Sequence, residues 1–474
     1  MFRFSLSLGA MWFIIRYSGE LTIKSRQVRA RFQKRLIANL SDALDSSGIQ
    51  YTVHVEWDRV LLEAETLEAG QVAARVFGIH SLSVIEHECE PTLEAIVRVG
   101  KEQYADRVRG KTFAVRARRL GKHKFRSLDV NVQLGSALDE TAAKVDLSHP
   151  EVTVHVDVRQ DKARFHCDRI MGSEGLPLGT QSKALALISG GFDSPAAAWA
   201  MLNRGVELDY LLCNLAGAAF ERSVVTVAKV LSDNWSHGVR PKLHVVDFEP
   251  MVTQLRRDVK PNYVQVILKR LMYRVGMRVA HALEAEAIVT GESVGQVSSQ
   301  TLRNLRVIEE VADLPVLRPL VGMNKQEIIT RTRAIGTYAL SASVQEYCAL
   351  VSHKPTTAAR FDVARAEEAR IDLDQLDELT DARKTIDLRS LDASDLALPY
   401  LFTEDVPENA VVIDCREEDQ YEAWHYPNAE CRPLEDLLAK FRDLDKSKVY
   451  VLYCPFGLQS SVAAEHMQTA GYQA

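Results

Sequence analysis

Residues Ala184–Gly205 read ALALISGGFDSPAAAWAMLNRG, and this stretch decides the fold of the largest part of the chain. The apolar run Ala184–Ile188 is typical of a buried parallel strand, and the small polar turn that follows it opens directly into a helix. We expect Ser194 to cap this helix, Pro195 to occupy its first position and Gly205 to end it in a left-handed conformation. The pattern therefore predicts a strand, a tight loop and a helix in immediate succession.

The loop between strand and helix is suited to a phosphate ligand. Gly190 and Gly191 let the backbone approach a ligand closely, and the helix N-terminus beyond them attracts anions, against which Asp193 can hold Mg²⁺. No lysine follows the glycines, so the loop is not a Walker loop. Ser-Gly-Gly-Xaa-Asp-Ser after a strand instead resembles the pyrophosphate loop of enzymes that adenylate a substrate with ATP. The alternative is an ordinary strand-to-helix turn.

Length and charge suggest several domains with different surfaces. A chain of 474 residues predicts about three or four domains. The net charge is -6, yet residues 16–35 carry seven bases against one acid and residues 101–126 carry ten against two. Residues 361–420 carry eighteen acids against six bases, and the stretch AEEARIDLDQLDELTDARKTIDL within them predicts a solvated helix or a linker. A nucleic-acid surface therefore belongs to the N-terminal third.

The cysteines and the hydropathy limit the compartment and the metal chemistry. Seven cysteines without a C-x-x-C pair argue against a disulfide scaffold and against a thiol-rich metal site, so we expect no resident metal and a cytoplasmic protein. No apolar run reaches the length of a membrane helix, and we expect no membrane partner.

The N-terminal third reads as two α+β units, predicted at residues 1–64 and 65–170. In the second, a basic cluster surrounds a glycine turn, with Phe125 expected to be exposed beside it: Arg116, Arg118, Arg119, Lys122 and Lys124. This cluster fits phosphate contacts, although a solvated basic loop is the alternative. The segment FAVRARRLGKHKFRSLDV resembles the THUMP domain of RNA-modifying enzymes, which implies RNA binding by these five residues.

Residues 178–385 alternate strands and helices, which predicts a doubly wound parallel sheet with its ligand at the carboxyl ends of the strands. Gly291 and Gln300 fall at one such end, and Lys269 lies on a helix whose apolar face should pack on the sheet. Asn324 and Glu327 form a predicted capping box that puts Lys325 in the first turn of a helix. A cation there opposes the helix dipole, so we expect a bound anion, the pyrophosphate or the adenylate, to compensate it; solvent screening is the alternative.

The last unit, residues 400–474, carries the cysteine of greatest interest. Residues 413–418 and 425–429 resemble the first signature of rhodanese domains, and Cys454 ends a predicted strand before a Pro-Phe-Gly-Leu-Gln-Ser loop and a helix. A cysteine below a helix N-terminus favours a thiolate able to carry a persulfide. Cys348 is predicted to lie in a loop and is a second candidate for chemistry. The remaining five are expected to be structural: Cys89, Cys167, Cys213, Cys415 and Cys431.

This order of units, together with SGGFDS, VTGESVGQVSSQ and the Cys454 loop, resembles the tRNA 4-thiouridine synthetase family. The resemblance implies an α/β multidomain protein that thiolates uridine 8 of tRNA with ATP and Mg²⁺. It implies that Asp193 and Lys325 serve adenylation, that Cys454 carries the persulfide and that Cys348 resolves it. It also implies ATP contacts along the strand end, the loop and the sheet edge: Leu187, Ile188, Ser189, Gly190, Gly191, Ser194, Lys269, Gly291 and Gln300.

The implied partners are tRNA, a cysteine desulfurase as sulfur donor, and the sulfur carrier protein of thiamine thiazole synthesis. Two other readings stay open at this point. One is an ATP-dependent amidating synthetase of the same superfamily, although no glutaminase unit is evident. The other is an RNA-binding or sulfur-carrier module without catalysis.

Overall fold

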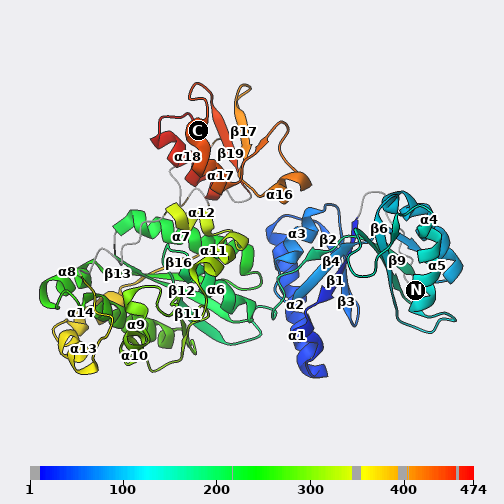
Figure 1. The fold of residues 1–474 in the computed structure, drawn as a ribbon. Helices are drawn as coiled ribbons and strands as arrows, with labels where there is room; N and C mark the ends of the chain where they lie inside the picture. Colours follow the sequence, from blue (N-terminus) through cyan, green and yellow to red (C-terminus); the bar gives the residue numbers. More distant parts are fainter. Residues whose placement is uncertain are drawn as a thin grey trace. The chain divides into compact units, whose positions relative to one another are not determined.

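The computed structural model describes residues 11–215, 217–343, 354–392, 395, 403, 405–454 and 458–474. Its described residues form four sheets (Figure 1). They divide into two compact units, of which the first holds the described residues up to Ser25 together with Ala43–Glu174, and the second holds Arg26–Asp42 with the rest of the chain.

The first sheet is antiparallel and runs in the order β10-β4-β1-β3-β2. Its strands are β1 (Met11–Tyr17), β2 (Tyr51–Val55), β3 (Arg59–Ala64), β4 (Ile79–Val84) and β10 (Ile170–Met171). The helices of this part are α1 (Gly19–Thr22), α2 (Arg26–Ser46) and α3 (Glu68–Ala74). The boundary predicted after residue 64 divides this sheet, because β4 pairs with β1 in antiparallel register. The pairing places the boundary near residue 86 instead.

Helix α2 also differs from the prediction, which placed it in the N-terminal unit of residues 1–64. Its residues 26–42 belong to the second compact unit. Arg35 Nε and Asn39 Nδ2 donate to the carbonyl oxygen of Leu178 at 2.7 and 3.0 Å. Asp42 accepts from the N–H of Gly238 at 2.7 Å. Hydrogen bonds to segments more than a hundred residues away cannot be read from the helix itself.

The second sheet runs in the order β5-β9-β8-β6-β7 and carries two helices. Its elements are β5 (His87–Cys89), α4 (Leu93–Val108), β6 (Thr112–Arg119), α5 (Ser127–Asp139), β7 (Lys144–Val145), β8 (Val152–Val158) and β9 (Ala163–His166). Alternate residues of β6 and β8, such as Phe113, Val115, Val154 and Val156, join the helices in one apolar core. The other face of β6 is thereby left free to carry arginines.

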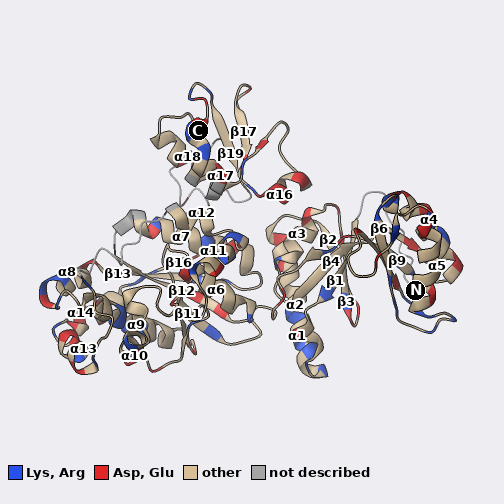
Figure 2. Cartoon of the chain, viewed as in Figure 1, with Lys and Arg blue, Asp and Glu red and all other residues tan. Residues whose placement is uncertain are grey.

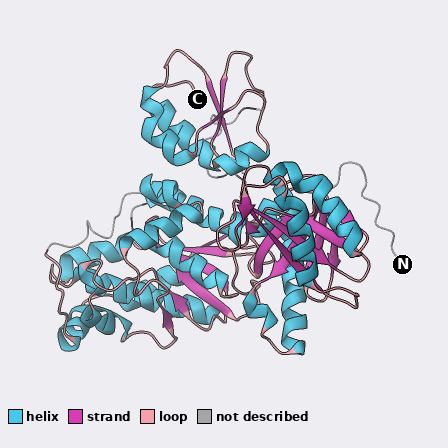
Figure 3. Ribbon diagram, turned by 45° about the vertical axis from the view of Figure 1, so that its right-hand side comes forward, coloured by secondary structure: helices cyan, strands magenta, loops and turns pink. Residues whose placement is uncertain are grey.

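The third sheet runs in the order β15-β14-β11-β12-β13-β16 and is parallel except at its β16 edge. Its strands are β11 (Lys183–Leu187), β12 (Glu207–Asn214), β13 (Lys242–Asp247), β14 (Ile288–Val289), β15 (Val316–Leu317) and β16 (Lys384–Asp387). Helices lie on both faces of the sheet, as a doubly wound fold requires (Figure 3). They are α6 (Asp193–Asn203), α7 (Gly217–Trp235), α8 (Glu249–Asp258), α9 (Val264–Ala282), α10 (Leu302–Glu309), α11 (Lys325–Ala334) and α12 (Tyr338–Ser343).

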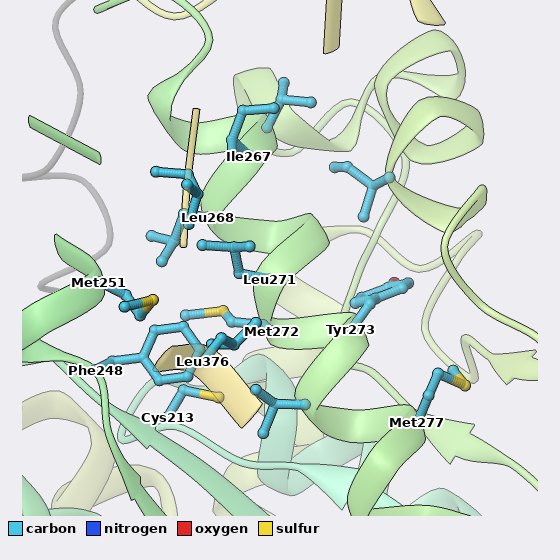
Figure 4. Packing of buried hydrophobic residues seen from close by; sticks show 14 of the residues in the cluster. Cys213, Phe248, Met251, Ile267, Leu268, Leu271, Met272, Tyr273, Met277 and Leu376 are labelled. Atoms are coloured by element: carbon cyan, nitrogen blue, oxygen red, sulfur yellow. The ribbon is translucent and has the colours of Figure 1, made fainter. Parts of the chain in front are cut away.

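The largest core of this domain fills one face of the third sheet. Leu185, Leu211, Cys213 and Val246 pack there against the apolar faces of α8 and α9 (Figure 4). The predicted packing of the Lys269 helix on the sheet is confirmed. Apolar residues along most of α9 pack in this core. This packing fixes the part of α9 around Lys269 at the carboxyl ends of the strands.

The acidic segment beyond residue 360 is neither a solvated helix nor a linker. It forms α13 (Phe361–Glu368), α14 (Leu373–Asp381) and the edge strand β16, and Ala364, Ile371 and Leu376 join the core of the domain. Glu367 and Glu368 are only 1% and 4% exposed. Glu368 accepts from Arg270 at 2.7 Å and from Arg274 at 2.9 Å. Arginines on α9 neutralise Glu368, whereas Glu367 accepts from the N–H of Lys260 at 3.0 Å and lies 3.1 Å from Lys260 Nζ. Composition alone does not reveal these partners.

The fourth sheet is small and parallel, in the order β18-β17-β19. Its elements are β17 (Val411–Asp414), α16 (Glu418–Ala423), β18 (Glu430–Cys431), α17 (Leu434–Lys440), β19 (Tyr450–Tyr453) and α18 (Leu458–Thr469). Asp414 is fully buried and pairs with Arg416 at 2.7 Å. None of the helices in the described ranges is long and apolar enough to span a membrane.

Candidate active site

The predicted loop joins β11 to α6, and a serine hydroxyl closes it. Ser194 Oγ accepts from the N–H of Ser189 at 2.9 Å and donates to its carbonyl oxygen at 3.1 Å. Ser194 is therefore not the helix cap: α6 begins at Asp193, Phe192 precedes it without a side-chain cap, and Pro195 lies at the third helical position. The predicted helix end is confirmed, since Gly205 has a φ of 81°.

Asp193 lies in the first turn of α6 and is held by two side chains from distant segments. Lys325 Nζ lies 2.9 Å from Asp193 Oδ1, and Gln296 Nε2 donates to Asp193 Oδ2 at 2.8 Å. The predicted capping box is present, with Glu327 N donating to Asn324 Oδ1 and Asn324 N donating to Glu327 Oε2. The anion that contacts Lys325 in this structure is the Asp193 carboxylate.

The ion pair between Asp193 and Lys325 can be broken at a small cost in free energy. The two side chains are 22% and 40% exposed, and ion pairs at such exposure are worth about 0–1 kcal/mol. Lys325 Nζ also lies 5.2 Å from the centre of the Phe192 ring. A phosphate can therefore compete for Lys325 at little cost, because the pair it replaces is weak.

A cavity of about 140 Å³ lies at the carboxyl ends of β11, β12 and β14, beside this loop. Asp193 lines it together with seven of the nine predicted ATP contacts: Leu187, Ile188, Ser189, Ser194, Lys269, Gly291 and Gln300. Gly190 and Gly191 lie in the adjoining loop and are not among its lining residues. The topology thus brings one end of α9, the β14 edge and the loop to a single hollow.

Gly291 faces the first turn of α6 from the neighbouring strand end. A Cβ atom at this position would lie 2.7 Å from both the carbonyl carbon of Asp193 and the backbone nitrogen of Ser194. Both atoms are backbone, so the loop itself would have to move. Glycine is required here by close approach.

A buried carboxylate forms the wall of the cavity next to Gly291. Glu292 is 4% exposed, and its Oε2 accepts from Tyr273 Oη at 2.7 Å, Thr290 Oγ1 at 3.0 Å and Arg318 Nε at 2.8 Å. Burial and the Glu292 charge raise the pKa of Tyr273 well above its ordinary value, so its phenol remains a hydrogen-bond donor. This network fixes the β14 end at the edge of the site.

The predicted basic cluster lies on β6 and the turn that follows (Figure 2). Arg116, Arg118, Lys122 and Lys124 are exposed, whereas Arg119 is half-buried and donates to the Gly121 carbonyl oxygen at 2.6 Å. Phe125 is half-buried and not fully exposed as expected, because its ring packs against the apolar core of this sheet and lies 5.4 Å from the His123 ring.

Three further cations share a hollow of about 480 Å³ with Arg116: Arg107, Lys111 and Arg169. They come from the end of α4, the turn after it and the segment after β9. Sequence analysis missed Arg169, and it did not connect Arg107 and Lys111 with Arg116. The spacing of these residues along the chain does not predict that they lie together, because they belong to separate elements that meet only in the folded domain.

Cys454 follows β19 directly and is half-buried, with its Sγ 3.5 Å from Ser460 Oγ in the first turn of α18. The predicted strand–cysteine–helix order is present in the described residues on either side of the loop. Cys213 and Cys415 are buried, and burial raises the pKa of Cys89 to about 11 and of Cys167 to about 12. Cys348 lies outside the described residues.

The sequence matches four protein-family models: ThiI ferredoxin-like domain over residues 12–83, THUMP domain over 90–168, Thiamine biosynthesis protein (ThiI) over 179–373 and Rhodanese-like domain over 402–474. A tRNA sulfurtransferase of Pyrobaculum aerophilum is 37% identical over 462 residues, which are 96% of this chain and 94% of the relative. The chain belongs to the tRNA sulfurtransferase family. A tRNA sulfurtransferase of Escherichia coli O1:K1 / APEC is 36% identical and covers 98% of each chain.

Solved structures share the fold of this tRNA sulfurtransferase family member. A 4-thiouridine synthetase, solved as an RNA complex with bound ATP, superposes with a TM-score of 0.67 at 29% identity, covering 79% of this chain and 99% of that one. The protein PH1313 of Pyrococcus horikoshii has the same fold, with a TM-score of 0.54 at 22% identity. The predicted family and the predicted fold class are confirmed.

In this tRNA sulfurtransferase family member, sequence analysis missed two parts of the site. The motif around Gln296 does not predict that its Nε2 donates to Asp193 Oδ2. The sequence likewise does not predict that Arg318 and Tyr273 donate to Glu292. Glu292, in the Gly-Glu-Ser turn after a buried strand, carried a usable signal. An acid placed beside a predicted ligand glycine is either a ligand residue or, as here, the centre of a supporting network.

Proposed function

We propose that this protein adenylates uridine 8 of tRNA with ATP and transfers persulfide sulfur to it, which gives 4-thiouridine. One observation carries the proposal. The loop after β11 borders a cavity whose lining brings Asp193, Lys269, Gly291 and Gln300 together, in a chain that spans nearly the full length of its tRNA sulfurtransferase relatives.

The chemistry of uracil explains why such a protein needs ATP. The O4 oxygen of uracil is a poor leaving group, so adenylation converts it into AMP, which a sulfur nucleophile can displace. The N–H groups at the start of α6 lack intrahelical acceptors, and together with the helix dipole they suit the departing pyrophosphate. Lys325 would then exchange the Asp193 carboxylate for a phosphate.

Mg²⁺ fits this site as a companion of ATP. Within the described residues, no group of three or more His, Cys, Asp and Glu side chains is arranged to hold a metal. Mg²⁺ is commonly bound by one or two carboxylates plus substrate phosphates, and Asp193 supplies one carboxylate beside the loop. We propose that Asp193 holds the ion that accompanies ATP, and that the ion neutralises phosphate charge when bound.

For sulfur transfer we propose Cys454 as the persulfide carrier and Cys348 as a thiol that resolves it, with a cysteine desulfurase as donor. The ThiI family description favours a second role, which is sulfur transfer to the carrier protein of thiamine thiazole synthesis. We propose the cytosol as the compartment, since both roles require reduced thiols and the first also requires tRNA.

For tRNA we propose phosphate contacts on the THUMP domain. The residues are Arg116, Arg118, Arg119, Lys122 and Lys124, together with the neighbouring Arg107, Lys111 and Arg169. Support comes from the exposure of most of these side chains and from the RNA in the related 4-thiouridine synthetase structure.

The decisive experiment replaces Asp193 by alanine. We expect Asp193→Ala to lower tRNA thiolation by about 100-fold or more, because an electrostatic contact at the reacting phosphates is lost, while persulfide loading of Cys454 stays intact. The readout is mass analysis of tRNA nucleosides from a deletion strain that carries each variant. Asp374→Ala, an exposed acid in the same domain, is the matched control. Thiolation retained in Asp193→Ala would favour a non-catalytic module.

A further inference from the structure

A second thiol lies next to Cys454 in the rhodanese-like domain. Strands β17 and β19 are parallel neighbours, with Asp414 opposite Tyr453 in their register. The N–H of Cys415 donates to the Tyr453 carbonyl oxygen at 3.0 Å, so the ladder continues one residue further. Cys415 is therefore the register neighbour of Cys454.

The two thiols also point to the same face of the sheet. Side chains alternate along a strand, so Ile413 and Cys415 share a face, as do Leu452 and Cys454 on the neighbouring strand. All four belong to one apolar cluster. On the other face, Tyr453 Oη donates to Asp414 Oδ2.

This placement is within reach of a disulfide bond. Neighbouring strands lie about 4.7–4.9 Å apart, and disulfides join Cα atoms separated by about 4.4–6.8 Å. The third cysteine of the domain differs: Cys431 is paired with Asp414, on the opposite face of the sheet.

The environment of Cys415 protects it from reagents in solution. The residue is 2% exposed, and burial, with the nearby Cys454 and Asp414, raises the pKa of its thiol well above the ordinary value. It stays protonated and inert until an electrophilic sulfur is placed beside it. In the Cys454 persulfide, Sγ is such a sulfur. Because Cys415 lies next to Cys454, the two sulfurs can react without a bimolecular encounter.

We propose that Cys415 resolves the Cys454 persulfide within the rhodanese-like domain, a proposal that rests on the proposed sulfur-carrying role of Cys454. The sulfur of the Cys415 thiol attacks Sγ of Cys454, and the thiol proton passes to the departing outer sulfur. The bond between Sγ and the outer sulfur breaks, and the outer sulfur leaves as hydrosulfide. That sulfur is reduced, the two cysteines are oxidised to a Cys415–Cys454 disulfide, and a dithiol reductant must reopen it.

The consequence is a route that delivers sulfide without Cys348. Sulfur carried on Cys454 can then leave the protein even when no activated tRNA is bound. Cys348 and Cys415 would compete for the same Sγ atom, one from another part of the chain and one from the next strand.

The test uses the full-length protein. It is loaded by a cysteine desulfurase and L-cysteine, separated from both, and incubated without tRNA, ATP or reductant. Sulfide release is measured over time, and cross-linked peptides are mapped by mass spectrometry. We expect Cys348→Ala to release sulfide and to form the Cys415–Cys454 link, and Cys348→Ala/Cys415→Val to release it at least tenfold more slowly while the persulfide persists.

Cys348→Ala/Cys431→Ser is the matched control and should behave like Cys348→Ala, since Cys431 lies on the opposite face. Cys348→Ala/Cys415→Ala, with circular dichroism of both Cys415 variants, separates loss of the thiol from loss of the fold. A loaded Cys348→Ala protein that forms no Cys415–Cys454 link overturns this inference alone. A wild-type protein that takes no sulfane sulfur on Cys454 overturns the proposed function, and this inference with it.

Discussion

At the scale of single residues, the site depends on close approach as much as on charge. Gly291 borders the cavity, and the first turn of α6 lies against it at a distance that leaves no room for a methyl group. The charges of Asp193 and Lys325 attract each other. The position of the loop that carries Asp193 depends in addition on Gly291, because a side chain at Gly291 would collide with the backbone of that loop.

Gly291→Ala should displace the loop and lower the rate of tRNA thiolation by about 100-fold, since errors of about 1 Å in a reacting geometry cost this much. ATP affinity, measured by calorimetry, should fall as well. The matched control is Gly322→Ala, because a Cβ atom at Gly322 meets nothing within 4 Å. Equal ATP affinity in the two variants would show that the loop tolerates the methyl group.

At the scale of elements, the acidic helices α13 and α14 complete the pyrophosphate-loop domain. Burial by itself would raise the pKa of Glu368, but hydrogen bonds from Arg274 and Arg270 outweigh it and hold this pKa below its ordinary value. Arg270 is 2% exposed and also pairs with Glu310 at 2.9 Å. The segment is thus bound to α9 by ion pairs that are protected from water.

Glu368→Gln should destabilise the domain by about 3 kcal/mol at pH 7, because it leaves buried arginine charge without its main partner. A carboxyl whose pKa is lowered by folding contributes stability above its unfolded pKa of about 4.3, and this contribution is lost as the pH falls through the folded pKa. The difference between wild type and variant should therefore shrink below about pH 4.3.

Urea unfolding followed at pH 7 and at about pH 3 measures this difference. Glu378→Gln is the matched control, since it removes an exposed acid from the adjoining helix. If Glu368→Gln and Glu378→Gln unfold at the same urea concentration at pH 7, the ion pairs do not stabilise the domain.

At the scale of the whole molecule, the charges are separated by domain. The net charge is -6, yet the THUMP domain gathers exposed arginines and lysines around β6 and the hollow beside it. An acidic chain can bind a polyanion when the contact region is locally basic and the acids lie elsewhere, where they are paired with arginines as on α13.

Lys122→Glu/Lys124→Glu should weaken tRNA binding and flatten its dependence on salt. Each lost phosphate contact lowers the slope of log K against log salt by about 0.7–0.9, so two lost contacts should remove roughly 1.5 from it. Filter binding at several salt concentrations gives both values. Lys440→Glu/Lys448→Glu changes the net charge equally on exposed positions of the rhodanese-like domain and serves as the control. Matching slopes in both double variants would assign the effect to net charge alone.

Features that depend on neighbours along the chain can be predicted from the sequence. The strand, loop and helix at Ala184–Gly205, the left-handed Gly205 and the capping box at Asn324 follow from periodicity and from hydrogen bonds within a few residues. The order of domains followed in the same way, because each carries its own local motif.

Packing between distant segments determines which of these local features come into contact. Lys325 and Gln296 reach Asp193 from segments more than a hundred residues away, Glu368 is buried because α9 presents arginines to it, and Cys415 lies beside Cys454 because β17 and β19 are neighbours. Ser194 closes the loop where a cap was expected, since its hydroxyl finds Ser189 once the turn has formed. The physical reason is the same in each case: the partner of a polar group is selected by packing, and sequence distance carries no record of it.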